Sequence, residues 1–168
     1  RVLLEGTSAE FLPGEAVLVM GPSGVGKSTL FRAIAGIWPF GVGHVHVPGG
    51  ARVLFLPQKP YLQVGSLRDV MNYPEYDGQY ADTDLRQTLV DCGLSHLAPR
   101  LDDHQNWALE LSAGEQQRIA MCRALLRRPD WLMLDEATSA LDAPAEAELY
   151  RLLRARLPDT TIISIGHR

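Results

Sequence analysis

The chain of 168 residues has few cysteines, no long apolar run and no excess of basic residues. Its two cysteines, Cys92 and Cys122, lack the close spacing of a metal or redox site, so we expect reduced thiols in a cytoplasmic protein. No apolar run approaches the roughly 18 residues of a membrane span, and neither end resembles a signal peptide. The net charge of -4 argues against nucleic-acid binding as the main function, although it allows a local basic patch.

Length and composition indicate one globular domain. With 46% hydrophobic and 21% charged residues, the chain can bury a sizeable core. Both ends resemble cuts within a longer polypeptide, because Arg1 leads directly into the apolar run Val2–Leu4 and Arg168 directly follows a strand-like run. We therefore expect residues 1–168 to be one domain excised from a longer chain.

The most informative segment is Gly21–Thr29, GPSGVGKST, which fits the phosphate-binding pattern G-x-x-x-x-G-K-[ST] in full. It lies between Ala16–Met20, an apolar run typical of a strand, and Leu30–Ala35, which is typical of a helix. The glycines let backbone N–H groups wrap around phosphate oxygens, and the helix dipole adds to the attraction. Lys27 can reach the β- and γ-phosphates, and the Ser28 hydroxyl can bind Mg²⁺. The sequence therefore predicts a nucleoside triphosphate site.

Strand and helix patterns alternate along the chain. The predicted strands are Ala16–Met20, Arg52–Leu56, Trp131–Leu134 and Thr161–Ile165, and the clearest later helices are Glu115–Arg127 and Pro144–Arg156. This order predicts an α/β fold, a P-loop NTPase core with a mainly parallel sheet. The polar segment Ser66–Leu109 shows helical stretches and no convincing strand, so we interpret it as a small helical insertion.

Two carboxylates follow the apolar run Trp131–Leu134. In open α/β sheets, ligands bind at the carboxyl ends of the strands, which is where Asp135 and Glu136 would lie. Asp135 could hold Mg²⁺ directly or through water, and Glu136 could orient or deprotonate an attacking water. An apolar strand that ends in two acids is common by chance, and the phosphate loop upstream makes this pair significant.

A third motif is Leu111–Arg118, LSAGEQQR. Ser112 and Glu115 form an S-x-x-E capping box, which predicts the start of a helix that Pro129 must end. Gly114 in the first turn costs about 1 kcal/mol relative to alanine. A glycine there is explained if a group such as a phosphate approaches the backbone closely.

Together these motifs resemble the nucleotide-binding domain of an ABC ATPase over nearly the whole chain. Gly21–Thr29 matches the Walker A loop, Leu134–Glu136 the Walker B motif, and Leu111–Gln116 the family signature with two variant positions. Further matches are Gln58 of the Q-loop, Ser139–Asp142 of the D-loop and the switch histidine His167. By this resemblance, residues from about 66 to 110 form a helical subdomain together with the signature helix.

The resemblance implies ATP and Mg²⁺ as ligands and assigns residues to them. The implied nucleotide-binding residues are Gly21, Pro22, Ser23, Gly24, Val25, Gly26, Lys27, Ser28, Thr29, Gln58, Ser112, Gly114 and Asp142. The implied magnesium ligands are Ser28, Gln58 and Asp135. The implied catalytic residues are Glu136 as the general base, His167 as a contact to the γ-phosphate and the attacking water, and Lys27.

The resemblance also implies partners. ABC domains form a head-to-tail dimer with two ATP molecules between the protomers, in which Ser112 and Gly114 act across the interface and Asp142 senses the opposite site. Gln58 would couple the site to a membrane-spanning transporter domain, and no nucleic-acid partner is expected. The sequences of the segments Ala35–Gly43 and Leu56–Leu62 resemble those of bacterial relatives of peroxisomal fatty-acyl-CoA transporters. This group includes the vitamin B12, bleomycin and antimicrobial-peptide uptake type. In that group the membrane domain precedes the ATPase domain on one chain, at the cytoplasmic face of the inner membrane.

Two other functions stay open. A non-transport ABC ATPase could act on nucleic acid or ribosomes, but the gap between Gln58 and Leu111 is too short for the long coiled coil of genome-maintenance members. A module that only clamps ATP would be expected to lose the catalytic carboxylate or the signature serine, and Glu136 and Ser112 are both present. Hydrolysis that drives transport is therefore the main prediction.

Overall fold

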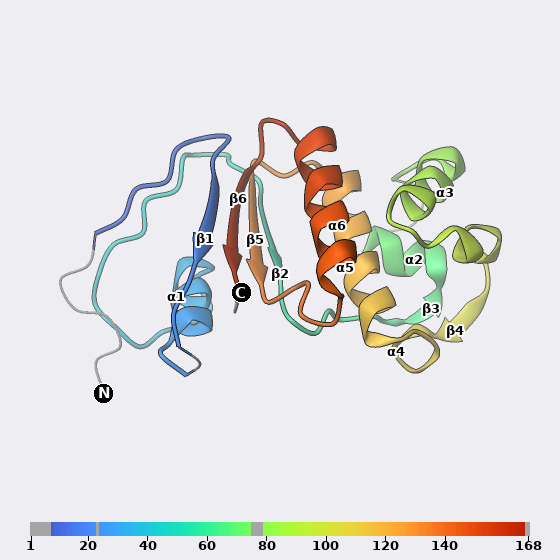
Figure 1. Ribbon diagram of the computed structural model, residues 1–168, viewed down its shortest axis with the longest axis horizontal. Helices are drawn as coiled ribbons and strands as arrows, with labels where there is room; N and C mark the ends of the chain where they lie inside the picture. Colours follow the sequence, from blue (N-terminus) through green and yellow to red (C-terminus); the bar gives the residue numbers. More distant parts are fainter. Residues whose placement is uncertain (1–7, 23, 75–78, 167–168) are drawn as a thin grey trace. The chain divides into compact units, whose positions relative to one another are not determined.

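The computed structural model describes residues 8–22, 24–74 and 79–166 (Figure 1). The chain divides into two compact units. Among the described residues, the first unit comprises those up to Pro57, Pro129–Glu136 and those from Asp159 onward, and the second comprises Gln58–Arg128 and Ala137–Pro158. No helix within the described ranges combines the length and the apolarity needed to cross a membrane.

The first unit is built on a four-stranded parallel sheet in the order β1-β6-β5-β2. Its strands are β1 (Ala16–Val19), β2 (Val53–Leu56), β5 (Trp131–Asp135) and β6 (Thr161–Ile165). All five residues of β6 and four of the five in β5 are buried, as expected for inner strands whose sequences do not alternate. The predicted α/β fold with a mainly parallel sheet is confirmed, with strand ends within one residue of those expected.

The register of the sheet brings functional segments to one edge. Val19 of β1 and Asp135 of β5 both pair with Ile165 of β6. Helix α1 (Lys27–Ile34) packs on the sheet through Phe31, which is fully buried and meets the ring of Phe55 edge to face at 6.4 Å. Met133, Ile163 and Ile165 complete this core cluster. The loop from β1 to α1 and the residues after β5 therefore leave the sheet at the same edge.

The second unit is mainly helical. Its helices are α2 (Leu67–Asn72), α3 (Asp82–Asp91), the 3₁₀ helix η1 (Ser95–Arg100), α4 (Trp107–Glu110), α5 (Ala113–Arg127) and α6 (Ala143–Arg156). Trp107 is fully buried, and its indole Nε1 donates a 3.0 Å hydrogen bond to the carbonyl of Gly65. Helix α5 ends at Arg127 because Arg128 takes a left-handed conformation with φ 46° and Pro129 follows.

The prediction of no strand between Ser66 and Leu109 was wrong. Strand β4 (His104–Asn106) lies within this segment, and it pairs antiparallel with β3 (Val64–Ser66), which ends where the segment begins, in a separate sheet of the second unit. Each has only three residues, and all three residues of β4 are polar and exposed. A strand this short carries no periodicity of its own, and only pairing with a distant segment creates it.

Candidate active site

The segment between β1 and α1 has the backbone of a phosphate-binding loop. Gly24 has φ 75° and Gly26 has φ 110°, conformations that strain residues with a side chain. Gly26 immediately precedes α1 and has no side chain with which to cap the helix, while its carbonyl accepts the first helical bond from Leu30 N at 2.9 Å. The N–H groups of the first turn are thus left for an anion.

Lys27 is the first residue of α1 and lies over this loop. Its side chain is 9% exposed, and Nζ donates hydrogen bonds to the carbonyls of Gly21 at 2.7 Å and Pro22 at 3.0 Å. These bonds hold the side chain within the loop, where phosphate oxygens could replace the carbonyls as its partners. The structure therefore places the cation inside the loop that the sequence predicted.

Ser28 and Asp135 meet at the same edge of the sheet. The hydroxyl of Ser28 donates a 2.7 Å hydrogen bond to Oδ1 of Asp135. Asp135 is the last residue of β5 and is only 6% exposed. A hydroxyl and a carboxylate are hard oxygen ligands of the kind that Mg²⁺ prefers. These two side chains could therefore hold a metal ion.

Glu136 follows β5 in a left-handed conformation with φ 53°. For a residue with a side chain, such a conformation costs on the order of 1 kcal/mol or more and is concentrated at functional sites. Its backbone N–H donates a 3.2 Å bond to the carbonyl of Ile165. The chain thus turns out of the sheet directly after Asp135, between the two adjacent carboxylates.

In the second unit, the predicted capping box is present at the start of α5. The Ser112 hydroxyl donates to Oε2 of Glu115 at 2.7 Å and accepts from the Glu115 backbone N–H at 3.3 Å, and the same Oε2 accepts from Ser112 N at 2.9 Å. His96 Nε2 lies 2.9 Å from Oε1 of Glu115. Bonds from the Ser112 hydroxyl, from its N–H and from His96 lower the pKa of Glu115, against a smaller opposing effect of burial. Ser112 is thereby held at the helix N-terminus.

The structure gives a reason for glycine at position 114 that could not be inferred from the sequence. A Cβ at this position would lie 3.3 Å from Cδ2 of Leu141 and 3.5 Å from the carbonyl of Ala140. Contact with residues 140–141 of the same unit therefore favours glycine, in addition to the expected approach of a phosphate. Asp142, the next residue along, caps α6 by accepting a 2.8 Å bond from Ala145 N. An Asp before Ala-Pro is a recognisable helix start, which the sequence analysis overlooked.

The expected site residues are distributed over both units. Lys27, Ser28, Asp135 and Glu136 belong to the first unit, and Gln58, Ser112, Gly114 and Asp142 to the second. His167 and Ser23 lie outside the described residues. Within the second unit, the backbone carbonyl of Gln58 accepts a 3.0 Å bond from Nε2 of Gln117, a residue to which the sequence analysis gave no function.

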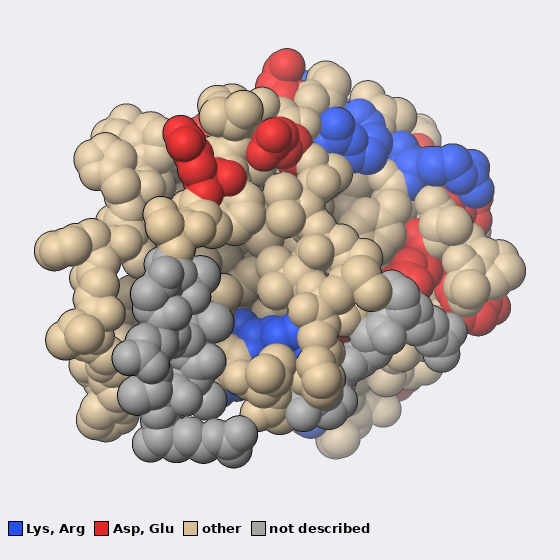
Figure 2. Space-filling model, turned by 60° about the vertical axis from the view of Figure 1, so that its left-hand side comes forward, with Lys and Arg blue, Asp and Glu red and all other residues tan. Residues whose placement is uncertain are grey.

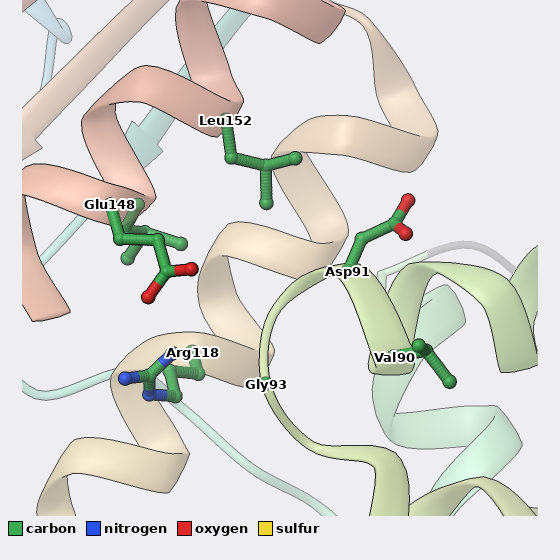
Figure 3. Close-up of a pocket in the computed structure, with 7 residues that line it drawn as sticks. Val90, Asp91, Gly93, Arg118, Glu148 and Leu152 are labelled. Carbon is green, nitrogen blue, oxygen red and sulfur yellow. The ribbon is translucent and has the colours of Figure 1, made fainter.

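A small hollow of about 100 Å³ lies in the second unit, apart from these residues. Figure 3 shows Glu148 and Leu152 lining it from α6 and Arg118 from α5. Arg118 Nη1 already donates to the carbonyl of Cys92 at 2.7 Å, and a Cβ on Gly93 would come within 2.9 Å of that nitrogen. The hollow contains none of the predicted site residues.

A parallel α/β sheet with this glycine loop, an enclosed lysine and a paired hydroxyl and carboxylate defines a P-loop nucleotide-binding domain. The family model described as "ABC transporter" matches residues 4–139. The chain belongs to the ABC transporter family, whose ATP-binding proteins hydrolyse ATP to power transport.

Individual relatives agree with this family. The chain is 48% identical to an uncharacterized ABC transporter ATP-binding protein of Synechocystis, with all of this chain and 26% of that protein covered. It is 36% identical to ABC transporter D family member 1 of Arabidopsis thaliana, over all of this chain and 13% of that protein. It is 35% identical to the inner membrane ABC transporter ATP-binding protein YddA of Escherichia coli, over all of this chain and 29% of that protein.

A solved structure of a bacterial Atm1-family ABC exporter with ATP bound matches the fold with a TM-score of 0.87. The sequence identity is 29%, and the match covers all of this chain and 32% of that one. The chain therefore spans less than a third of each of these proteins.

Proposed function

We propose that this domain binds ATP with Mg²⁺, hydrolyses it, and thereby drives an ABC membrane transporter. The observation that carries the proposal is the contact of Ser28 with Asp135, beside the phosphate loop that encloses Lys27. It joins a hydroxyl and a carboxylate from two sequence motifs at the carboxyl edge of one parallel sheet, where such folds bind ligands.

The chemistry follows from the residues at this edge. Lys27 exchanges its bonds with the loop carbonyls for bonds to phosphate oxygens and neutralises charge that develops on the γ-phosphate. Ser28 and Asp135 would hold Mg²⁺, which when bound would supply further positive charge at the phosphates. Glu136 accepts a proton from the attacking water, and His167 contacts the γ-phosphate. Gln58 contributes a further oxygen ligand for the metal.

The proposed active form is a head-to-tail dimer with ATP between the protomers. The capping box of Ser112 and Glu115 uses the N–H groups of these two residues, and the N-terminus of α5 would present its other N–H groups to an anion. Ser112 and Gly114 would approach the γ-phosphate bound by the partner, and Asp142 would report the state of the opposite site.

We further propose a membrane-spanning partner domain, fused before this domain in the parent chain, and a location at the cytoplasmic face of the inner membrane. Support comes from relatives several times longer than the chain, among them an inner-membrane protein. Action on nucleic acid is the weaker alternative. Figure 2 shows a face on which acidic and basic side chains form small separate groups among uncharged ones, and the net charge is -4.

The test is light scattering on the Glu136→Gln variant with and without Mg-ATP at millimolar concentration. The variant should bind ATP, hydrolyse it about a hundredfold more slowly than wild type, and change from monomer to dimer when ATP is added. Unchanged hydrolysis would mean that another group is the base. A variant that stays monomeric both as the isolated domain and within the intact polypeptide would contradict the sandwich.

A further inference from the structure

Gln117 lies in the second turn of α5 and is 3% exposed. Its amide joins three segments of the second unit. Nε2 donates to the carbonyl of Gln58 at 3.0 Å and to the hydroxyl of Ser139 at 3.2 Å, and Oε1 accepts from the backbone N–H of Ala140 at 2.9 Å. Both N–H groups and the carbonyl of the side chain are therefore used.

Only an amide of this length can make these three bonds. An ionised glutamate would accept from Ala140 but could not donate to the Gln58 carbonyl or to Ser139. Methionine has the size but neither the donors nor a strong acceptor, and asparagine is one methylene shorter. The demand for two donors and one acceptor points to a specific function in orientation, since hydrophobic packing alone would not require it.

Gly114 is three residues before Gln117 and so lies on the same side of α5. The absence of a side chain at Gly114 lets the helix approach Leu141 and the carbonyl of Ala140, while Gln117 binds the N–H of Ala140. Residues 139–141 are thus held against the start of the signature helix by close packing and by hydrogen bonds.

We propose that Gln117 is a positioning residue for ATP hydrolysis. It keeps the backbone at Gln58 and the segment Ser139–Ala140 in a fixed relation to the helix that begins after Ser112. Asp142, which is two residues beyond Ala140 and caps α6, is placed by the same contacts. The Q-loop at Gln58, the D-loop Ser139–Asp142 and the signature at the start of α5 would then change position together when nucleotide binds. This inference rests on the proposed hydrolysis of ATP and adds a residue to which the family motifs gave no function.

The test uses Gln117→Met and Gln117→Glu in the intact transporter, with kcat and KM for ATP measured from pH 5.5 to 9. We expect kcat to fall about tenfold or more, because small displacements of positioning groups slow reactions strongly. KM should stay within about twofold, since the bonds of Lys27 within its loop do not involve Gln117. Thr88→Val is the matched control: it removes one buried bond of the second unit, from Thr88 Oγ1 to the Asp84 carbonyl, and should retain kcat.

The pH dependence separates orientation from mere packing. Burial raises the pKa of a carboxyl placed at position 117. In its protonated form the carboxyl regains an O–H donor, so the ratio of Gln117→Glu to wild-type kcat should rise as the pH falls. Gln117→Met should stay slow throughout. A Gln117→Met kcat within about twofold of wild type, or a flat ratio for Gln117→Glu, would overturn the inference.

Ser139→Ala supplies an independent variant, because Ser139 is exposed and its loss threatens the fold little. It should lower kcat by less than Gln117→Met and have no further effect in the Gln117→Met background. Additive effects in the double variant would count against a shared assembly. Wild-type protein without ATPase activity would defeat the proposed function itself, whereas an active wild type, an inactive Lys27→Ala and normal Gln117 variants would defeat only the positioning inference.

Discussion

The hydroxyl of Ser28 and the carboxylate of Asp135 are 2.7 Å apart although 107 positions separate them in the sequence. One follows the glycine loop after β1 and the other ends β5, and β6 lies between these two strands in the sheet. The contact therefore lies at the edge where three neighbouring parallel strands end. Substitution of either residue tests the metal site that we propose.

Removal of the carboxylate should weaken metal binding more than it weakens folding. For Asp135→Asn we expect the Mg²⁺ concentration for half-maximal hydrolysis to rise about tenfold or more, because a neutral amide attracts the cation less. Ser28→Ala should shift it in the same direction. Titration of ATPase activity with Mg²⁺ at fixed ATP measures both. An unchanged Mg²⁺ requirement in Asp135→Asn would remove this residue from the metal site.

Lys27→Ala should abolish detectable hydrolysis, a loss of at least about a hundredfold, because the ammonium that faces the loop carbonyls is the proposed γ-phosphate contact. Arg32→Ala is the control, since Arg32 is an exposed cation on the same helix. The measurement is phosphate release under saturating ATP. Near-normal turnover in Lys27→Ala would refute the assigned site, and equal losses in both variants would point to general destabilisation.

Gly114→Ala separates two explanations for one glycine. The added Cβ should gain about 1 kcal/mol of helix propensity but meet Leu141 at 3.3 Å, so the free energy of unfolding should change little. ATP-dependent dimerisation should nevertheless weaken about tenfold or more, because the methyl group also obstructs the partner's phosphate.

The double variant Gly114→Ala with Leu141→Ala opens space for the new methyl group within the chain. If the glycine serves the phosphate, dimerisation stays impaired in light scattering on the Glu136→Gln background. Recovery of the dimer in the double variant would show that contact with Leu141 alone requires the glycine.

The capping box should make stability depend on pH. The pKa of Glu115 is lowered in the folded state, so the native protein binds fewer protons than the unfolded one near this pKa. Its contribution is therefore complete above the unfolded pKa of about 4.3 and is lost as the pH falls through the lower folded pKa. Urea unfolding should show Glu115→Gln less stable than wild type by roughly 0.3–1 kcal/mol at pH 6, because the neutral amide loses the attraction of the carboxylate to the helix N-terminus. The difference should shrink below pH 4, and a constant difference would contradict the assignment.

Much of the first unit could be predicted because its signals are local or concern burial. Thr161–Ile165 was predicted with the bounds of β6, and Trp131–Leu134 falls one residue short of β5. Continuous apolar runs of this kind indicate strands that are buried on both faces of the sheet. The helix predicted over Pro144–Arg156 begins one residue earlier, at Ala143, because Asp142 caps it.

The sequence by itself determined the phosphate loop and the start of the signature helix. These features depend on glycine conformations, a capping box and a following proline. Each acts within a few residues, so it can be recognised from the local sequence. Only the tertiary structure decided that β3 and β4 pair, that Gly114 faces Leu141, and that Gln117 binds segments 59 and 22 positions away. The hydrogen-bond partners of a side-chain amide cannot be predicted from the neighbouring sequence, because long-range bonds depend on which surfaces the folded chain brings together.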